Sequence, residues 1–478
     1  MESSTDFNLD LGQAHRLHFA GIGGIGMSAL ARYFRTRGLH ITGYDRTETD
    51  LTRKLTEEGI EVTYTPREDW ATAADAVIYT PAVGEQFAEL TAARAQGLPV
   101  VKRAAVLGAI TRLQRTLAVA GTHGKTSTSS LLATLLHESG KGCTALVGGV
   151  MSAYGSNFIM GDEDAELVVV EADEFDRSFL HLSPWLGILT SLDPDHLDIY
   201  GTAEAVAEAY QAFVNRIQRI QPGGYLLLHA ALAGRIVPPD GVSLYLYGLE
   251  EDFTLPLPEH YAMLKVEKQE GITQWLTLTG SLGSLHKLQL PFPGAHNARN
   301  ACAALAAALL AGVSAVRIGP ALAKFRGIRR RFEVWLDEPQ VALIDDYAHH
   351  PTELQAAIAT ARACFPHRPL LVVFQPHLFT RTRDFYLGFA QSLSAADIVL
   401  LTEIYPAREL SIPHITSDLI FQHVNSPQKE LLTLNNLPKS LHKYLNGPIS
   451  VLITGAGDID TLLPEIRDTL LITYKPPE

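Results

Sequence analysis

The sequence predicts an α/β protein with three domains: a Rossmann-like N-terminal domain, a central domain with a mainly parallel sheet, and a Rossmann-like C-terminal domain. Its 478 residues correspond to about three domains of ~150 residues each. Apolar, strand-like runs alternate with helix-like segments along the chain, as in sheets that are covered by helices. Two of these runs lead directly into glycine-rich turns, which is typical of ligand-binding βα units.

The composition supports well-buried cores and argues against several classes of partner. Hydrophobic residues make up 46% of the chain and charged residues 19%, which argues against disorder. The net charge of −13 argues against nucleic acid or an anionic membrane surface as a partner. The three cysteines, Cys143, Cys302 and Cys364, form no metal or redox motif. Because there is no long apolar run and no signal peptide at the N-terminus, we expect a cytoplasmic protein without membrane insertion.

The first domain is predicted to cover residues 1–112. Strands are expected at Arg16–Ala20, His40–Gly43 and Ala76–Tyr79, with a helix from Met27 to Arg37. The pattern predicts a parallel βαβ series that begins with a glycine turn.

That turn, Gly21-Ile-Gly-Gly-Ile-Gly26, matches the dinucleotide fingerprint, and Asp45 follows the second strand, where it would meet a ribose. NAD is the common ligand of this pattern. However, the domain is short for a complete dinucleotide fold, and the N-terminus of a helix needs only a pyrophosphate to bind. The turn therefore favours a mononucleotide or a nucleotide-sugar diphosphate.

The central domain is predicted to cover residues 113–326. Buried strands are expected at Glu166–Glu171 and Leu186–Thr190, and an alanine-rich helix at Ala298–Ala311. The later part, residues 223–291, alternates apolar and polar residues. This alternation predicts antiparallel strands, which include Tyr225–His229, Ser243–Tyr247 and Trp275–Thr279.

The strongest motif of the chain is the segment Thr116-Leu-Ala-Val-Ala-Gly-Thr-His-Gly-Lys-Thr-Ser-Thr128. A buried strand leads into two glycines, Lys125 and Thr126, and a helix-like segment follows. Such a loop directs backbone N–H groups and a lysine at phosphates and places a hydroxyl beside Mg²⁺. Val119 stands where the common pattern has its first glycine, so the loop is a shorter relative of that pattern. The motif predicts a domain of the P-loop ATPase type.

Polar residues follow two further strands of this domain. Glu171 ends a strand beside the phosphate loop, where a carboxylate is well placed to hold Mg²⁺. His196 follows the next strand and is either a metal ligand or a structural hydrogen-bonding residue. We expect Asp173, Glu174 and Asp176 to form, in part, a solvated acidic turn.

His296, Asn297 and Asn300 stand at the start of the alanine-rich helix. An asparagine at this place can cap the helix or read an adenine edge, because its amide offers both a donor and an acceptor. The spacing favours capping.

The third domain is predicted to cover residues 327–478. Its expected elements are strands at Val341–Asp345, Pro369–Phe374, Ile398–Thr402 and Ile449–Thr454, and helices at Glu353–Cys364 and Phe385–Leu393. Two polar loops, 345–350 and 374–383, leave what we expect to be adjacent strand ends. Their acidic, basic and imidazole groups suit a zwitterion such as an amino acid. The arginines of the run Arg329–Arg331, at the start of this domain, would neutralise a transferring phosphoryl group.

In this order the motifs resemble those of the Mur ligases of bacterial peptidoglycan synthesis, over essentially the whole chain. The segments that carry the resemblance are Gly21–Met27, Ala120–Thr126, Glu171–Glu174, Ser178–Leu182, Asp195–Asp198, His296–Asn297, Asp345–Glu353 and Phe374–His377. Two residues depart from the family pattern: Ser191 stands where many relatives have asparagine, and Leu378 where some have arginine.

The resemblance implies a UDP-sugar-binding first domain, an ATP-binding central domain and a C-terminal domain that brings an amino acid. The implied ATP-binding residues are Gly121, Thr122, His123, Gly124, Lys125, Thr126, Ser127, His296, Asn297, Asn300, Arg331 and Asp346. The implied UDP-sugar-binding residues are Gly23, Gly24, Ile25, Gly26, Asp45, Thr80, Arg103 and His123. The implied amino-acid-binding residues are Tyr347, His349 and Arg381. Mg²⁺ would be held by Thr126, Glu171 and His196, and the implied catalytic residues are Lys125, Glu171, His196, Arg331 and His349.

The implied activity joins L-alanine to the lactoyl carboxylate of UDP-N-acetylmuramate through an acyl phosphate that ATP supplies. The implied ligands are thus UDP-N-acetylmuramate, L-alanine, ATP and Mg²⁺, on a monomer or weak homodimer. Three alternatives remain. A family member that attaches a tripeptide to the same sugar is one. An NAD-dependent oxidoreductase would leave the phosphate loop unexplained, and a nucleotide-switch protein would leave the two charged loops of the third domain unexplained.

Overall fold

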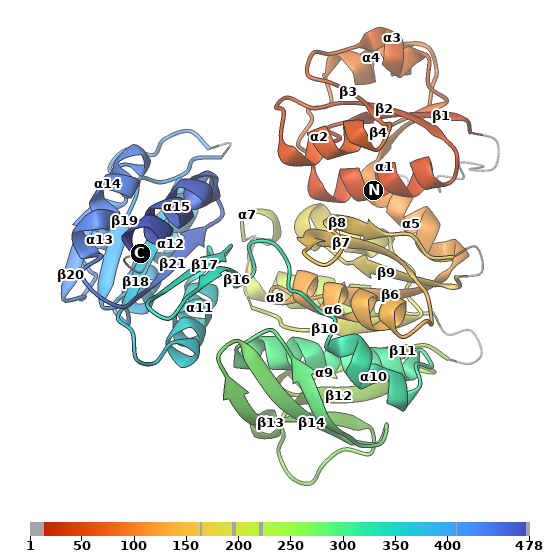
Figure 1. Ribbon diagram of the computed structural model, residues 1–478. Helices are drawn as coiled ribbons and strands as arrows, with labels where there is room; N and C mark the ends of the chain where they lie inside the picture. The colour runs from red at the N-terminus through yellow and green to blue at the C-terminus, as the bar shows by residue number, and fades with distance from the viewer. Residues whose placement is uncertain (1–13, 163–164, 194–196, 219–222, 408, 475–478) are drawn as a thin grey trace. The chain divides into compact units, whose positions relative to one another are not determined.

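The computed structural model describes residues 14–162, 165–193, 197–218, 223–407 and 409–474. The strands in these residues form three sheets that follow one another along the chain (Figure 1). The chain divides into two compact units: Met1–Lys265, Leu276–Gln289 and Arg299–Phe325 make the first, and Val266–Trp275, Leu290–Ala298 and Arg326–Glu478 make the second. The predicted α/β class is confirmed, and the domain bounds at residues 112 and 326 stay a prediction.

The N-terminal sheet is parallel, with the strand order β3-β2-β1-β4-β5. The order reverses at β1, and in such sheets ligands bind beyond the carboxyl ends of the strands at the point of reversal. The predicted glycine turn follows β1 at this point. The strands are β1 (Arg16–Ala20), β2 (His40–Tyr44), β3 (Glu61–Thr63), β4 (Ala76–Tyr79) and β5 (Val100–Lys102). The helices are α1 (Ile25–Thr36), α2 (Asp50–Glu57), α3 (Glu68–Thr72), α4 (Ala88–Ala95) and α5 (Arg103–Leu113).

The central sheet has the order β15-β14-β13-β12-β11-β10-β6-β9-β7-β8. Its strands are β6 (Arg115–Ala120), β7 (Thr144–Met151), β8 (Ser156–Ile159), β9 (Leu167–Glu171), β10 (Leu186–Leu189), β11 (Tyr225–His229), β12 (Ser243–Leu249), β13 (Tyr261–Glu270), β14 (Thr273–Gly280) and β15 (Leu285–Leu290). Its helices are α6 (Lys125–Glu138), the 3₁₀ segment η1 (Phe175–His181), α7 (Leu197–Tyr200), α8 (Ala203–Val214), α9 (Ala295–Leu310) and α10 (Ala315–Leu322).

The prediction of antiparallel strands is wrong for β11 and β12. Each pairs in parallel with the strand before it in the chain, β10 and β11 respectively. The segment between β11 and β12 is long enough for the crossover that parallel pairing requires. The tyrosines of β12 cause the alternating pattern in the sequence because their rings are apolar and their hydroxyls are polar.

The C-terminal sheet has the order β16-β17-β21-β18-β19-β20. Its strands are β16 (Glu333–Asp337), β17 (Val341–Asp346), β18 (Leu370–Gln375), β19 (Ile398–Leu401), β20 (Gln428–Leu431) and β21 (Ile449–Gly455), and its helices are α11 (Pro351–Cys364), α12 (Phe379–Leu393), α13 (Asp418–Phe421), α14 (Leu437–Leu441) and α15 (Leu463–Thr473). The expectation that the two polar loops leave adjacent strands is wrong, because β21 lies between β17 and β18. The last long strand of the chain thus inserts between two strands that are consecutive in the sequence.

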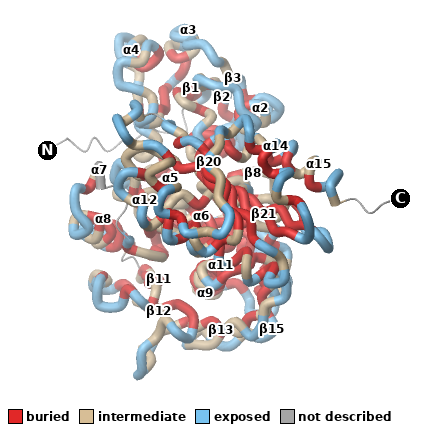
Figure 2. Tube along the Cα trace, turned by 90° about the vertical axis from the view of Figure 1, so that its left-hand side faces the viewer, coloured by how far each residue is buried: buried red, intermediate tan, exposed pale blue. Residues whose placement is uncertain are grey.

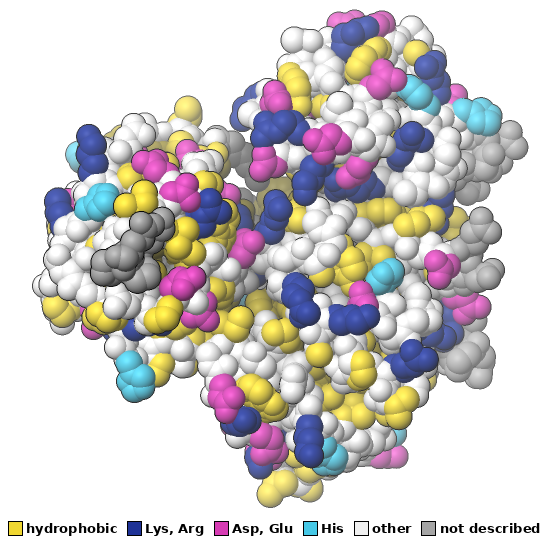
Figure 3. All heavy atoms as spheres, in the orientation of Figure 1, with side chains coloured by type: hydrophobic (Ala, Val, Ile, Leu, Met, Phe, Trp, Pro, Cys, Tyr) yellow, Lys and Arg dark blue, Asp and Glu magenta, His cyan; other side chains and the backbone are white. Residues whose placement is uncertain are grey.

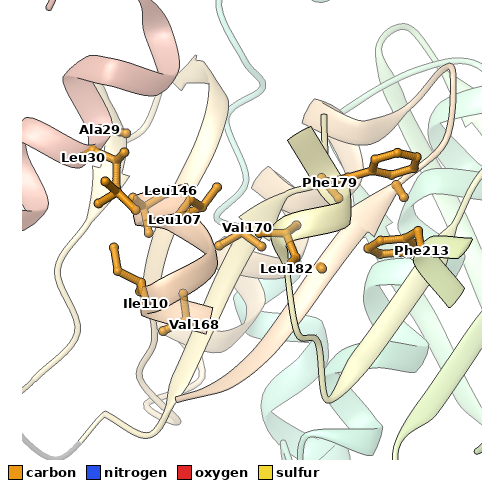
Figure 4. Close-up of a cluster of buried hydrophobic side chains, with 14 of the residues drawn as sticks. Ala29, Leu30, Leu107, Ile110, Leu146, Val168, Val170, Phe179, Leu182 and Phe213 are labelled. Carbon is orange, nitrogen blue, oxygen red and sulfur yellow. The ribbon is translucent and has the colours of Figure 1, made fainter. Parts of the chain in front are cut away.

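Burial follows this layering. Strands such as β21 are buried at every position, whereas a surface helix such as α12 keeps an exposed face (Figure 2). The N-terminal and central sheets share one hydrophobic core: Leu30 of α1 and Leu107 of α5 meet Leu146 of β7 and Val170 of β9 (Figure 4). On the face drawn in Figure 3, basic and acidic side chains are interspersed. Within the described residues, no helix has both the length and the apolar character needed to cross a membrane.

Candidate active site

The phosphate loop connects β6 to α6 and needs glycine at two positions. Gly121 has a φ of +128°, and a Cβ atom there would lie 2.1 Å from Oγ1 of Thr190. Gly124, with a φ of +81°, caps α6, and a Cβ there would lie 2.4 Å from Oδ1 of Asn300. The loop therefore lies close to its neighbours and leads into a helix N-terminus, which is an anion-binding arrangement.

Lys125 is held inside this loop. Its Nζ donates to the carbonyl oxygens of Gly121 at 2.7 Å and Thr122 at 3.1 Å. It also lies 2.9 Å and 2.8 Å from the two carboxylate oxygens of Glu174. Burial alone would lower the pKa of Lys125, but the carboxylates of Glu174 and Glu171 more than offset this and raise it. The ammonium therefore stays charged where a phosphate would bind.

The prediction of a solvated acidic turn is wrong for Glu174. This residue is only 4% exposed, since its carboxylate turns inward to Lys125. Its backbone carbonyl accepts a hydrogen bond from the Tyr200 hydroxyl at 2.6 Å. Little in the sequence signals the pair of Glu174 with Lys125 beyond the resemblance of the whole Glu171–Glu174 segment.

Glu171 and Thr126, two of the three predicted metal ligands, lie together. Oε1 of Glu171 accepts from the Thr126 hydroxyl at 3.1 Å, and Oε2 accepts from the backbone N–H of Gly148 at 2.9 Å. Burial raises the pKa of Glu171. A hydroxyl and a carboxylate are oxygen ligands that suit Mg²⁺. The described residues contain no cluster of three or more His, Cys, Asp or Glu, and His196 lies outside them.

The segment after β10 supports the phosphate loop. The backbone N–H of His123 donates to Oγ of Ser191 at 2.8 Å, and the Thr122 hydroxyl donates to the carbonyl of Asp193 at 2.7 Å. Nε2 of His123 lies 3.5 Å from the Asp193 carboxylate. The sequence pattern predicts no role for Ser191 or Asp193. In the sequence, the one feature that could have pointed to these two residues is their position just after a parallel strand.

Asn300 and Asn297 differ in their surroundings. Oδ1 of Asn300 accepts from the Thr128 hydroxyl at 3.3 Å, next to the phosphate loop. Nδ2 of Asn297 donates to the carbonyl of Pro293 at 2.7 Å, and His296 lies beside Gly294. This bond to a carbonyl differs from the predicted cap, in which the side-chain oxygen accepts from a backbone N–H.

The glycine turn of the first domain is held by its neighbours. The N–H groups of Gly21 and Ile22 donate to the carbonyl of Tyr44, and a Cβ at Gly21 would lie 2.6 Å from Cγ2 of Thr80. Oδ2 of Asp45 accepts from the N–H of Gly23 at 2.7 Å. Asp45 thus supports the turn, and its contact with a ribose stays a prediction. Gly24, Ile25 and Gly26 then form the beginning of α1.

A cavity of about 150 Å³ brings the two predicted binding regions together. Gly26 and Arg103 line it from the first domain, and Gly148, Glu171 and Asp173 line it from the central domain. Its apolar wall includes Leu30, Leu107 and Leu146, which point toward one another in Figure 4. A predicted sugar-binding arginine and a predicted metal-binding carboxylate therefore face the same space.

Gly26→Ala is expected to raise KM for the sugar nucleotide about 10-fold or more, the equivalent of a lost charge-assisted hydrogen bond of about 1.5 kcal/mol. The new Cβ would lie 2.4 Å from Nη1 of Arg103 and would displace the guanidinium. Steady-state kinetics with each substrate varied in turn tests this. Gly84→Ala is the control, because a Cβ there meets nothing within 4 Å. An equal rise in KM for ATP would contradict the assignment.

In the C-terminal domain, Asp346 is fixed at the end of β17. Its Oδ2 accepts from the N–H of Phe332 and its Oδ1 from the N–H of Ala348, both at 2.8 Å. Burial raises its pKa to about 6, although Arg331 acts in the opposite direction. The Arg331 guanidinium lies 5.4 Å from the ring centroid of Tyr347. Arg331, Asp346 and Tyr347 therefore form one group.

The polar segments 345–350 and 374–383 meet although β21 separates their strands. The predicted loop 374–383 is shorter than expected, because α12 begins at Phe379 rather than near Phe385 and carries Arg381. The His349 ring lies 5.2 Å from the Tyr347 ring and 6.1 Å from the His377 ring, between centroids. Nη1 of Arg381 lies 3.3 Å from Nδ1 of His377. Burial lowers the pKa of His349, so its imidazole is neutral at pH 7. A separate cavity of about 550 Å³ beyond β19 and β20 is lined by none of these side chains.

Asp345→Asn is expected to stabilise the protein, and the stabilisation should be about 1–3 kcal/mol larger at pH 8 than at pH 5. Burial raises the pKa of Asp345 to about 8, with partial relief from Arg330 at 3.7 Å. The folded state therefore binds a proton that the unfolded state releases near pH 4, and stability falls as the pH rises toward 8. Chemical unfolding at both pH values tests this, with the exposed Asp337→Asn as control. An unchanged pH dependence would contradict it.

Comparison with known proteins agrees with this arrangement. Three family models match: "Mur ligase family, catalytic domain" over residues 16–115, "Mur ligase middle domain" over 119–308 and "Mur ligase, glutamate ligase domain" over 330–457. The UDP-N-acetylmuramate–L-alanine ligase of Porphyromonas gingivalis is 45% identical over 461 residues, which cover 95% of this chain and 99% of that protein. The corresponding ligase of Phocaeicola vulgatus is 42% identical over 467 residues, 96% of this chain and 98% of that protein.

Among solved structures, the UDP-N-acetylmuramate–alanine ligase of Thermotoga maritima has a TM-score of 0.78 and 27% identity, covering 96% of this chain and all of that chain. With identities of 40% and more to relatives over nearly their full length, this chain belongs to the Mur ligase family.

Proposed function

We propose that the chain is an ATP-dependent ligase that joins L-alanine to the lactoyl carboxylate of UDP-N-acetylmuramate. The observation that supports this most is the cavity that Arg103 and Glu171 both line, because the reaction needs a sugar carboxylate beside a metal-bound phosphate. The names of the relatives at 42–45% identity support the choice of sugar and amino acid. A cytoplasmic location, with ATP and UDP-sugars at hand, is part of the proposal.

The central domain binds and orients ATP. Lys125 and the N-terminus of α6 offer charge and N–H groups to the phosphates, which stabilises the charge of the transferred phosphoryl group. Thr126 and Glu171, together with His196 as predicted from the sequence, would hold Mg²⁺. A bound Mg²⁺ would neutralise charge between the phosphates and the sugar carboxylate. Arg103 and the glycine turn bind the sugar nucleotide.

The C-terminal domain supplies the amino acid. Arg381 pairs with the alanine carboxylate. The neutral imidazole of His349 accepts the proton that the alanine ammonium must lose before its amine attacks. Arg331 stabilises the charge of the acyl phosphate. Attack on the carbonyl carbon forms the amide bond, and inorganic phosphate leaves with the electron pair of its C–O bond.

A single assay of phosphate release tests the activity and its amino acid. Purified protein with ATP, Mg²⁺ and UDP-N-acetylmuramate is expected to release phosphate with L-alanine and slowly with glycine or L-serine, because one methyl group discriminates by only about 1–3 kcal/mol. Release that needs no sugar would indicate a switch protein. Preference for a tripeptide over L-alanine would assign another activity within the family, and tight NAD binding without a response to the sugar would overturn the proposal.

A further inference from the structure

Two neighbouring acidic residues hold the two cations that the substrates need. Glu174 binds the ammonium of Lys125, the predicted ATP-binding cation. Asp173 binds Arg103, the predicted cation for the UDP-sugar, with Oδ2 at 3.3 Å from Nη2. One short segment of the central domain therefore occupies a positive group of each substrate site.

The contacts of Lys125 show which partner a phosphate would replace. An ammonium has three N–H donors. Two of them reach the carbonyls of Gly121 and Thr122, which belong to the loop itself and stay with the lysine. The third reaches Glu174, whose side chain comes from another segment. A phosphate oxygen can therefore take its bond to Lys125 from Glu174 without any change in the loop.

Arg103, like Lys125, has a carboxylate partner that a phosphate could replace. Its guanidinium lies against Gly26 at the beginning of α1 and lines the cavity, while its ion pair reaches across to Asp173. The side chain of Asp173 is 40% exposed, so water can hydrate its carboxylate when the guanidinium leaves it, and no buried charge is left unpaired. A diphosphate at the glycine turn would compete with Asp173 for Arg103.

The backbone just after these two carboxylates is strained, and both of its ends are fixed. Asp176 and Arg177 have φ values of +53° and +54°, in the left-handed region that such residues rarely adopt. On one side, Tyr200 donates to the carbonyl of Glu174. On the other, α5 packs so closely that a Cβ at Gly108 would lie 2.5 Å from the carbonyl of His181. Strain of this kind clusters at active sites and ligand clamps.

We propose that Glu174 and Asp173 are placeholders for substrate phosphates. Before substrates bind, Glu174 positions Lys125 and Asp173 positions Arg103. ATP then displaces Glu174 from Lys125, and the UDP-sugar displaces Asp173 from Arg103. The identity of the sugar rests on the proposed function, whereas the exchange of a carboxylate for a phosphate on each cation does not. Both acids are positioning residues, because they act on the substrates through Lys125 and Arg103.

Removal of each charge should strengthen the binding of one ligand only. Calorimetric titration with Mg²⁺ and a non-hydrolysable ATP analogue is expected to give a Kd about 3- to 10-fold lower for Glu174→Gln than for the unaltered protein, with the Kd for UDP-N-acetylmuramate unchanged. Asp173→Asn should lower the Kd for UDP-N-acetylmuramate by a similar factor and leave the analogue unchanged. The control is Glu208→Gln on the exposed face of α8, which should alter neither.

This crossed pattern separates the proposal from a purely structural role. Equal or weaker binding of the matching ligand by either variant, or the same change for both ligands, would overturn it. If Glu174→Gln does not fold, Glu174→Asp takes its place. It keeps the charge but moves it away from Lys125 by one methylene, so it should lower the Kd for the analogue by less than the factor expected for Glu174→Gln. The titrations need no turnover. If the unaltered protein binds both ligands but does not ligate L-alanine, the proposed function is refuted, whereas the inference about Asp173 and Glu174 still stands.

Discussion

Lys125→Ala is expected to lower the rate of ATP-dependent ligation by about 10³-fold, the effect of removing a charge that stabilises a transition state in a preorganised site. The ammonium lies inside the phosphate loop, where two loop carbonyls and Glu174 hold it. Alanine at this position keeps the helix but removes the cation that would face the transferred phosphoryl group. Single-turnover measurement of acyl-phosphate formation, with ATP and the sugar nucleotide saturating and the amino acid left out, reports the loss directly.

The structure adds a second consequence, because Lys125→Ala leaves Glu174 without the cation that it faces. Breaking a buried ion pair from one side costs about 3–5 kcal/mol, and Glu174 is only 4% exposed. The double variant Lys125→Ala/Glu174→Gln should therefore regain thermal stability without regaining activity.

The control is the exposed Lys141→Ala, which lies just beyond α6 and should keep both activity and stability. Ligation by folded Lys125→Ala protein near the normal rate would show that the loop binds something other than the transferred phosphate.

The local parts of this site could be predicted from the sequence because each is a short segment with its own physical requirement. The glycines of the phosphate loop, the lysine after them and the carboxylate at the end of β9 are fixed by backbone geometry within a few residues of a strand. The strands β1 and β4 have the predicted ends for the same reason, since each is an apolar run with polar flanks. A pattern of this kind needs no knowledge of distant partners.

The parts that depend on distant partners could not be predicted. The place of β21 between β17 and β18 is set by the pairing of strands far apart in the chain, which the order of motifs does not contain. Glu174 follows Asp173 in an acidic segment that is typical of a solvated turn. It is buried because Lys125 comes to it from another element. Composition predicts that a charged segment is, on average, exposed to solvent. Here the ion pair with Lys125 buries Glu174 instead.

Glu171→Gln is expected to raise the Mg²⁺ concentration needed for half-maximal activity by about 10- to 100-fold, a range typical of lost support at a metal site. The carboxylate already accepts one hydrogen bond on each oxygen, from Thr126 and from Gly148. Each oxygen keeps a second lone pair for a cation, whereas an amide offers only one oxygen and no charge. A Mg²⁺ titration of the ligation rate measures the effect.

The thermal stability of Glu171→Gln should stay close to that of the unaltered protein. Burial raises the pKa of Glu171, so the charge that this substitution removes is already disfavoured in the folded protein. The matched control is Glu166→Gln, an exposed residue directly before the other end of the same strand. It removes the same charge without reaching the phosphate loop, so its Mg²⁺ curve should coincide with that of the unaltered protein. Equal Mg²⁺ dependence in Glu171→Gln and Glu166→Gln would leave Glu171 as the residue that ties Thr126 to β7, and the metal would have to be held elsewhere.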